Sequence, residues 1–303
     1  MQKRIGILRG GLGDNYHYSL RRGGELLSYL TENLGEKYKP VDILIDREGV
    51  WHLAGRPIQL SDLMHRVDLI WNVAHANHSH SLDSLSVPHL SAAPFFEALK
   101  SSKQLLREHL RTTDVSLPRS VILPVYQADF DGPADRYAMK KAIDIHAKFG
   151  APWIVKSFAP EQNMGMHLAK TFPELVSAIT DGIKHKDSII VEEFITGSVG
   201  AFHSVVGFRG EEIYVFPQSP GSIFSPTEKE KLNALVKDLH RHLNAEHYLK
   251  SDLLITPRGK VYLLEFENTP DLKSGSHLHQ ACEHSGTNIN QLVEHMLENT
   301  GKL

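Results

Sequence analysis

The spacing of apolar residues predicts alternating strands and helices in the first third of the chain. Residues 3–11, 40–46 and 67–75 form apolar runs, and continuous runs of this kind are typical of strands buried in a parallel sheet. Between the first two runs, residues 18–34 repeat apolar side chains at helical spacing. This alternation over residues 1–95 predicts a doubly wound α/β domain.

The remainder of the chain mixes helices with hairpins, which predicts α+β structure in its C-terminal half. The expected helices cover residues 94–113, 135–150, 172–185, 226–243 and 289–300. The expected strands cover residues 114–123, 152–158, 188–197, 201–217 and 251–268, the last two ranges each being a hairpin. Gly150 is expected to cap the helix before it. We predict three lobes: residues 1–95, 96–196 and 197–303.

Composition narrows the classes of function. The 303 residues carry a formal net charge of −3, which provides no general basic field for nucleic acid or an anionic membrane. The single cysteine, Cys282, cannot form an internal disulfide, as expected in a reducing compartment. The basic N-terminus precedes an apolar run too short for a signal peptide, and no stretch has the length of a membrane span. We therefore expect a cytoplasmic protein.

Three carboxylates on the last predicted hairpin form a candidate metal site. Glu265 and Glu267 are two residues apart on a strand, so both project from one face, and the hairpin turn brings Asp252 near them. Like charges this close repel each other, whereas Mg²⁺ bound by carboxylate oxygens would neutralise the cluster. In the alternative, one acid faces solvent and the other pairs with Lys250 or Lys260.

Two other strands carry polar residues in unusual places. Lys156 lies inside an apolar strand, where a charge needs a partner; either a phosphate or a neighbouring strand acid would serve. Residues 192–195, Glu-Glu-Phe-Ile, end the strand at 188–197 and could bind a flat ring, or simply leave the core. Three of the 19 histidines, His75, His78 and His80, cluster in a polar segment, which leaves a metal-binding protein as an alternative.

The order of these features resembles the ATP-grasp superfamily and, within it, the D-alanine–D-alanine ligases. A lysine in a strand, then a V-E-E-F strand end, then S-D-L-L and L-L-E-F-E-N-T-P follow one another. The resemblance runs from the glycines at 10–11 to the last helix and is strongest over residues 150–200 and 245–297. It implies a Rossmann-like N-terminal domain followed by two ATP-binding lobes.

The resemblance also implies residues that bind ATP and metal. Lys103, Lys156 and Gly165 would contact the phosphates of ATP. The adenine would be framed by Glu192, Glu193, Phe194 and Ile195. One or two Mg²⁺ or Mn²⁺ ions would be held by Asp252, Glu265 and Glu267.

Four further residues acquire roles at the substrates. His75 would lie beside the first amino acid, and Ser276 near the carboxylate of the second. Lys250 occupies the place of an arginine that steadies the transferring phosphate. Asn15 stands where the family has an acid for the substrate ammonium, and the neighbouring Asp14 could take its place.

Other departures from the family also fall mainly at substrate positions. Val199 replaces the acid that holds the ribose, and Asp271 replaces a glycine of the oxyanion site. The loop that covers the phosphates keeps one clear glycine, Gly165, and the loop that closes over substrates is cut to residues 218–226. Substrate identity is therefore the open part of the resemblance.

The resemblance implies that the protein is an ATP-dependent carboxylate–amine ligase that forms an acyl phosphate. The expected substrate is D-alanine, and the expected pathway is peptidoglycan synthesis. Two lobes would close on Mg–ATP and exclude water from the acyl phosphate. A homodimer is the common assembly in that family. A ligase for another amino acid or amine and a nucleotide-binding protein without catalysis remain alternatives.

Overall fold

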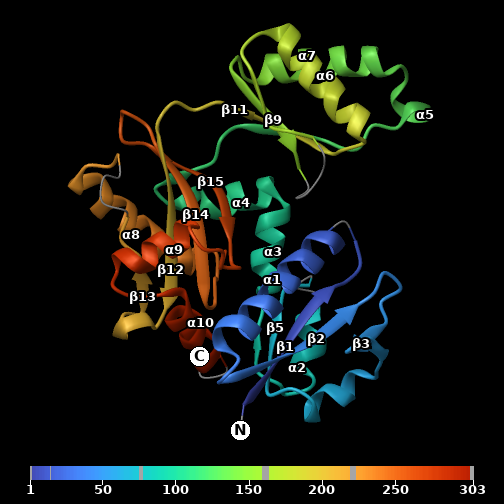
Figure 1. Ribbon diagram of the computed structural model, residues 1–303. Coiled ribbons are helices and arrows are strands. Elements are labelled where there is room, and N and C mark those ends of the chain that lie inside the picture. The colour runs from blue at the N-terminus through green and yellow to red at the C-terminus, as the bar shows by residue number, and fades with distance from the viewer. Residues whose placement is uncertain (1, 14, 75–77, 159–163, 219–222, 301–303) are drawn as a thin grey trace. The chain divides into compact units, whose positions relative to one another are not determined.

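The chain forms two compact units in a computed structural model (Figure 1). The described residues are 2–13, 15–74, 78–158, 164–218 and 223–300. Unit 1 comprises Met1–Ser116, Ser198–Ile255 and Leu263–Leu303, and unit 2 comprises Leu117–Gly197 and Thr256–Tyr262. The division into three lobes stays a prediction.

A six-stranded sheet with a parallel centre begins unit 1. Its strand order is β4 (Arg56–Pro57), β3 (Trp51–Leu53), β2 (Tyr38–Ile45), β1 (Lys3–Gly10), β5 (Leu69–Asn72) and β6 (His89–Leu90). Strand β1 pairs in parallel with β2 and β5, as the continuous apolar runs predicted, whereas β3 and β4 form an antiparallel edge. Helix α1 (Tyr16–Leu34) buries Leu26 and Leu30 in the same core as Ile5 and Ile7 of β1.

Short helices lie between strands of this sheet and between the sheet and the rest of unit 1. They are η1 (Leu60–His65), α2 (Ser79–Asp83), α3 (Pro94–Ser101), α4 (Lys103–His109) and η3 (Leu110–Thr112). The single helix predicted over residues 94–113 is wrong. Ser102 interrupts it with extended backbone (φ −130°, ψ 99°), and its hydroxyl accepts a hydrogen bond from the Leu105 amide at 3.2 Å. Ser102 is thus the N-cap of a second helix.

A five-stranded sheet forms the other part of unit 1. Its order is β13 (Ile213–Val215), β12 (Ser198–Val206), β14 (Tyr248–Ile255), β15 (Val261–Glu267) and β7 (Val115–Ser116). Strand β12 runs antiparallel to both β13 and β14, and the 3-10 turn η4 (Phe208–Gly210) lies between β12 and β13. Both predicted hairpins are present.

Three helices accompany the second sheet: α8 (Pro226–His242), α9 (His277–His284) and α10 (Ile289–Asn299). Helix α8 starts with a capping box between Ser225 and Glu228, a strong local start signal. Leu292 and Val293 of α10 share one apolar cluster with Ile5 and Ile7 of β1, so the two ends of the sequence build a common core. In the described ranges, no helix combines the length and apolar character needed to cross a lipid bilayer.

Unit 2 contains a four-stranded antiparallel sheet in the order β10 (His167–Ala169), β9 (Trp153–Ser157), β11 (Ile189–Glu193) and β8 (Ser120–Leu123). Its helices are α5 (Ala128–Asp131), α6 (Ala134–Lys148) and α7 (Phe172–His185). The predicted C-cap at Gly150 is wrong, because α6 ends at Lys148 and Phe149 is extended (φ −158°). Phe149 is only 4% exposed, and burying its ring takes the chain out of the helix before the glycine.

Candidate active site

A small cavity in unit 1 collects polar side chains from four segments that are far apart in sequence. It has a volume of about 60 Å³, and we call it the α3 cavity. Its polar lining residues are Asn15, Tyr18, Asn72, Glu97, Lys100 and Glu267. The cavity lies where the parallel strands β1 and β5 end, and this edge of an open α/β sheet is the usual place for a ligand.

The turn after β1 places helix α1 beside this cavity. Gly10 has a φ of +86°, and a Cβ atom there would lie 2.1 Å from the Ile45 carbonyl oxygen, so only glycine fits. The Gly10 amide donates to the Ser19 hydroxyl at 2.9 Å, which ties α1 to β1. Asn15 precedes the first turn of α1 and makes no side-chain capping bond. The predicted substrate residue Asn15 therefore lies at the cavity with its amide uncommitted to the helix.

An ion pair closes the opposite side of the α3 cavity. The Lys100 ammonium lies 2.6 Å from the Glu267 carboxylate, and each side chain is about one-third exposed. Burial by itself would lower the pKa of Lys100, but attraction to Glu267 and Glu97 outweighs this and raises it. Burial also raises the pKa of the Tyr18 phenol, and the charge of Glu267 adds to the effect. Lys100 is therefore a permanent cation at this site.

Lys100 was missed by reasoning from the sequence. The sequence feature that could have pointed to it was Glu267, an acid that needs a cation partner. The partners considered for this acid were Lys250 and Lys260. Lys103, which was predicted, also lies close to β15, because its ammonium donates to the Leu264 carbonyl at 3.4 Å. The helices α3 and α4 thus each direct one lysine to the strand that carries the acids.

A second cavity in unit 1 is lined by the predicted substrate residue Lys250 and the predicted metal ligand Asp252. This cavity, which we call the α9 cavity, has a volume of about 520 Å³, and its polar lining residues are Gln218, Lys250, Asp252, His277 and Gln280. The Lys250 ammonium pairs with the Asp252 carboxylate at 2.8 Å. On the adjacent strand, His203 lies opposite Lys250 and is buried. Burial and the charge of Lys250 lower the pKa of His203 to about 3, so it is neutral.

The three predicted metal ligands are not assembled into a ready-made cluster. Among the residues that the structure describes, no group of three or more His, Cys, Asp or Glu side chains is placed to hold a metal ion. Asp252 contacts Lys250, Glu267 contacts Lys100, and Glu265 is exposed on β15. Their oxygen donors fit Mg²⁺, which is commonly bound through one or two carboxylates and the phosphates of its substrate.

The predicted nucleotide residues of unit 2 lie on neighbouring strands. Lys156 of β9 and Glu192 of β11 approach to 3.4 Å, so the lysine inside the strand has an acid partner. Glu193 is held by Arg119 at 2.6 Å. The predicted residues Phe194 and Ile195 follow β11; the Phe194 ring is 41% exposed. Gly165 is exposed. The structure thus groups Lys156 and Glu192 and leaves the Phe194 ring accessible.

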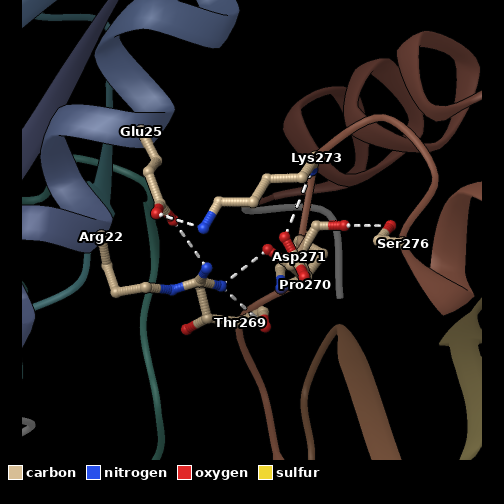
Figure 2. A network of polar contacts seen from close by, with 7 residues as sticks. All are labelled: Arg22, Glu25, Thr269, Pro270, Asp271, Lys273 and Ser276. Atoms are coloured by element: carbon tan, nitrogen blue, oxygen red, sulfur yellow. Dashed lines mark hydrogen bonds and ion pairs between the residues drawn. The ribbon is translucent and has the colours of Figure 1, made fainter. Parts of the chain in front are cut away.

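The segment between β15 and α9 is fixed by a residue of α1, as Figure 2 shows. The Arg22 guanidinium donates to the Pro270 carbonyl at 2.8 Å and to the Thr269 carbonyl at 3.3 Å. It also pairs with Glu25 at 2.8 Å, and Lys273 contacts the same carboxylate at 3.0 Å. Arg22 was not singled out from the sequence, because its partners are backbone atoms nearly 250 positions away.

Ser276, predicted near a substrate carboxylate, is engaged in local structure. Its hydroxyl accepts a hydrogen bond from the His279 amide at 3.1 Å and donates to the Asp271 carbonyl at 3.0 Å (Figure 2). Ser276 is therefore the N-cap of α9 and stands beside the α9 cavity residue His277. His75 and Asp14 lie outside the described residues, as does most of the loop at 160–165.

Comparisons with known proteins show which proteins this chain is similar to. A family model described as "D-ala D-ala ligase C-terminus" matches residues 220–298. A D-alanine–D-alanine ligase of Geotalea uraniireducens is 25% identical over 97% of this chain and 94% of its own length. The D-alanine–D-alanine ligase of Geobacter sulfurreducens is also 25% identical, over 97% of this chain and 93% of its own.

Solved structures show that the likeness extends to the fold. The structure of the D-alanine–D-alanine ligase from Coxiella burnetii superposes with a TM-score of 0.69 and 19% identity, covering 98% of this chain and 94% of that one. At this identity the match shows the fold, and that fold includes both units. By sequence over nearly its whole length and by fold, this chain is similar to D-alanine–D-alanine ligases.

Proposed function

We propose that this protein is an ATP-dependent ligase that joins two molecules of D-alanine, a step in peptidoglycan precursor synthesis. One observation carries the proposal: the match to a D-alanine–D-alanine ligase spans 97% of this chain and 94% of the relative. The alignment therefore covers nearly the whole of the relative.

The reaction in this proposal has two steps. The carboxylate of the first amino acid attacks the γ-phosphorus of ATP, which gives an acyl phosphate and ADP. The amine of the second amino acid then attacks the acyl carbon, expels phosphate and loses a proton to form the amide. Phosphoryl transfer of this kind depends mainly on positioning and on neutralisation of charge.

The residues of unit 1 fit those requirements. Mg²⁺ at Asp252, Glu265 and Glu267 would neutralise the charge on the transferring phosphoryl group when bound. Lys103, which reaches β15, is assigned to the phosphates, and Lys250 to the transferring group. The α3 cavity is small enough to exclude bulk water, which protects an acyl phosphate from hydrolysis.

The residues of unit 2 are assigned to the nucleotide. Lys156 carries a positive charge on β9 and is three-quarters buried, a setting in which it would bind a phosphate oxygen strongly. The accessible ring of Phe194 and the neighbouring Ile195 offer apolar surface to an adenine. The carboxylates of Glu192 and Glu193 would accept hydrogen bonds from its amino group or from the ribose.

A second candidate function is a ligase of the same type with a different second substrate. The observation that favours it is the α9 cavity, which at about 520 Å³ is far larger than the α3 cavity. It also presents His277 and Gln280, two polar groups that a methyl side chain would not use. A polar or larger amino acid, or another amine, would occupy this space better than alanine.

The test is the purified protein with Mg–ATP and D-alanine, assayed for ADP by enzyme coupling and for dipeptide by mass spectrometry. We expect both products in equal amounts. The assay is repeated with D-alanine plus D-serine, glycine, L-alanine or a simple amine, and a mixed product formed faster than the D-alanine dipeptide supports the second candidate. Binding of Mg–ATP without any turnover would contradict both and indicate a nucleotide-binding protein that has lost catalysis.

A further inference from the structure

The α3 cavity contains one acid that the structure leaves without a polar contact. Glu97 lies on α3 three residues before Lys100, so both side chains project from one face of the helix. Lys100 is bonded to Glu267 at 2.6 Å. In the described part of the chain, the Glu97 carboxylate makes no hydrogen bond and no ion pair. The lining therefore carries two negative charges and one positive charge, an excess that attracts a cation.

An unpartnered donor lies in the same lining. Asn72 ends β5 and is only 7% exposed. Its Oδ1 atom accepts a hydrogen bond from the Ala74 amide at 3.0 Å, but its Nδ2 amide has no acceptor among the described residues. Buried donors are almost always paired, so this amide is suited to donate to a ligand that enters the cavity. A carboxylate oxygen of a ligand would be a suitable one.

The size of the cavity limits what can enter. Its volume of about 60 Å³ corresponds to about four to six water-sized positions. Alanine, with six non-hydrogen atoms, is at the upper end of that range. A free acid and a free amide donor in so small a space match the two ends of a small zwitterionic amino acid.

We propose that Glu97 is a specificity-determining residue that receives the ammonium group of the amino acid in the α3 cavity. The Asn72 amide donates to a carboxylate oxygen of the same molecule. Lys100 pairs with Glu267 at the cavity wall, which leaves Glu97 as the acid available to the ammonium. The position at which an acid is expected from the resemblance is the neutral Asn15, and here the acid comes from α3. This inference rests on the proposed function, since it concerns the first substrate of that reaction.

The test is direct binding of small ligands, which needs no turnover. Wild type, Glu97→Gln and Glu108→Gln are titrated with D-alanine and with D-lactate, in which a hydroxyl replaces the ammonium, and the chemical shifts of ligand and protein are followed by NMR. Glu108 is the matched control, because it is 70% exposed on α4 and pairs with Arg111 at 3.4 Å. Thermal melting establishes that each variant is folded, and Glu97→Asp provides a second variant that keeps the charge.

We expect Glu97→Gln to weaken D-alanine binding by about ten- to a hundredfold, the range for loss of a hydrogen bond to a charged group. D-lactate binding should stay unchanged, so the preference for the ammonium compound disappears. Glu97→Asp should recover part of the affinity, and Glu108→Gln should bind like wild type. Equal D-alanine affinity in wild type and Glu97→Gln would overturn the proposal, and so would a wild type that binds no amino acid.

The outcome separates this inference from the proposed function. A wild type that binds D-alanine through Glu97 but forms no dipeptide would refute the ligase and uphold the assignment of Glu97. A wild type that forms dipeptide, with a KM for D-alanine that Glu97→Gln leaves unchanged, would uphold the ligase and refute Glu97. When both hold, Glu97→Gln raises the KM for D-alanine and leaves the KM for ATP at the wild-type value.

Discussion

The ammonium of Lys100 lies 2.6 Å from the carboxylate of Glu267, although 167 positions separate the two residues in the chain. The contact joins the C-terminal turn of α3 to the last residue of β15. It places a fixed cation beside an acid that the family resemblance assigns to a metal ion. The ion pair also forms one wall of the α3 cavity, so we expect its loss to affect both the stability of the protein and the binding of substrate.

Removing either partner of this pair should destabilise the protein. Lys100→Met or Glu267→Gln leaves the other group half-buried without its charge partner, and we expect each to lower the free energy of unfolding by about 1–2 kcal/mol. The double variant should lose less than the sum of the two, because the second change removes no further interaction. Urea unfolding of the four proteins measures this coupling. Losses that add up would show that the pair is not a stabilising contact.

The exposed acid of β15 gives a sharper test of metal binding. Glu265 is exposed, so Glu265→Gln should leave thermal melting unchanged. We expect the variant to lose ATP-dependent phosphate release by at least about a hundredfold, and EDTA to abolish release in wild type. A Mn²⁺ titration followed by electron paramagnetic resonance should show weaker binding in the variant. The control is Glu230→Gln on the exposed face of α8. Full activity in Glu265→Gln would remove this residue from the metal site.

Arg22 should be irreplaceable even by lysine. Its planar guanidinium serves Glu25 and the carbonyls of Thr269 and Pro270 at once, whereas a lysine ammonium cannot span these acceptors in the same geometry. We expect Arg22→Met to lower the free energy of unfolding by about 1–3 kcal/mol and Arg22→Lys by somewhat less.

Activity provides a second measurement for Arg22. Since the arginine fixes the segment that leads to Ser276 and His277, both variants should also reduce kcat/KM in the ligase assay. Arg136→Met, at an exposed position of unit 2, is the control for a lost arginine charge. Retention of wild-type stability by Arg22→Lys would mean that charge alone holds the segment.

Two buried histidines should make stability fall in mild acid. Burial lowers the pKa of His203 to about 3 and that of His240 to about 4, and both are at most 3% exposed. In the unfolded chain these groups take up protons near pH 6.5, while in the fold they stay neutral, so acid favours the unfolded state. Each contributes stability that is present above pH 6.5 and is lost as the pH falls toward 4.

The size of this effect follows from proton linkage. Between pH 6.5 and pH 5, each histidine should cost up to about 2 kcal/mol of unfolding free energy. Urea unfolding at pH 7.5 and 5.0 measures the difference. In the variant His203→Gln/His240→Gln the pH dependence should be shallower, even if its stability at neutral pH is lower. His284→Gln, at an exposed position, should behave like wild type. An unchanged slope in the double variant would show that these histidines are not the cause.

Local patterns in the sequence were sufficient for most individual elements. The helix predicted over residues 172–185 matches α7 at both ends, because Thr171 caps its start and apolar residues recur at helical spacing. The parallel strands of the first sheet were also expected, since continuous apolar runs indicate burial on both faces. Such signals lie within a few residues of each other in the sequence, so the sequence alone is enough to predict these elements.

The failures occurred where the chain leaves the helical conformation although the apolar spacing continues. The helical pattern continues through Ser102, yet the backbone there is extended and starts a new helix. Gly150 looked like a helix end, but α6 ends at Lys148, two residues before the glycine, where the buried Phe149 is extended. In both cases the spacing of apolar residues is helical, but Ser102 caps a new helix and Phe149 turns into the core.

For the candidate site, the sequence by itself determined which chemical groups are available. It also determined that Glu265 and Glu267 share one face of a strand, because side-chain alternation is a property of the strand alone. Only the tertiary structure decided which cation meets which acid: Lys100 with Glu267, Lys250 with Asp252 and Lys156 with Glu192. Two of these pairings join different strands or helices, and the distance between such elements depends on how the whole core packs, which no local periodicity encodes.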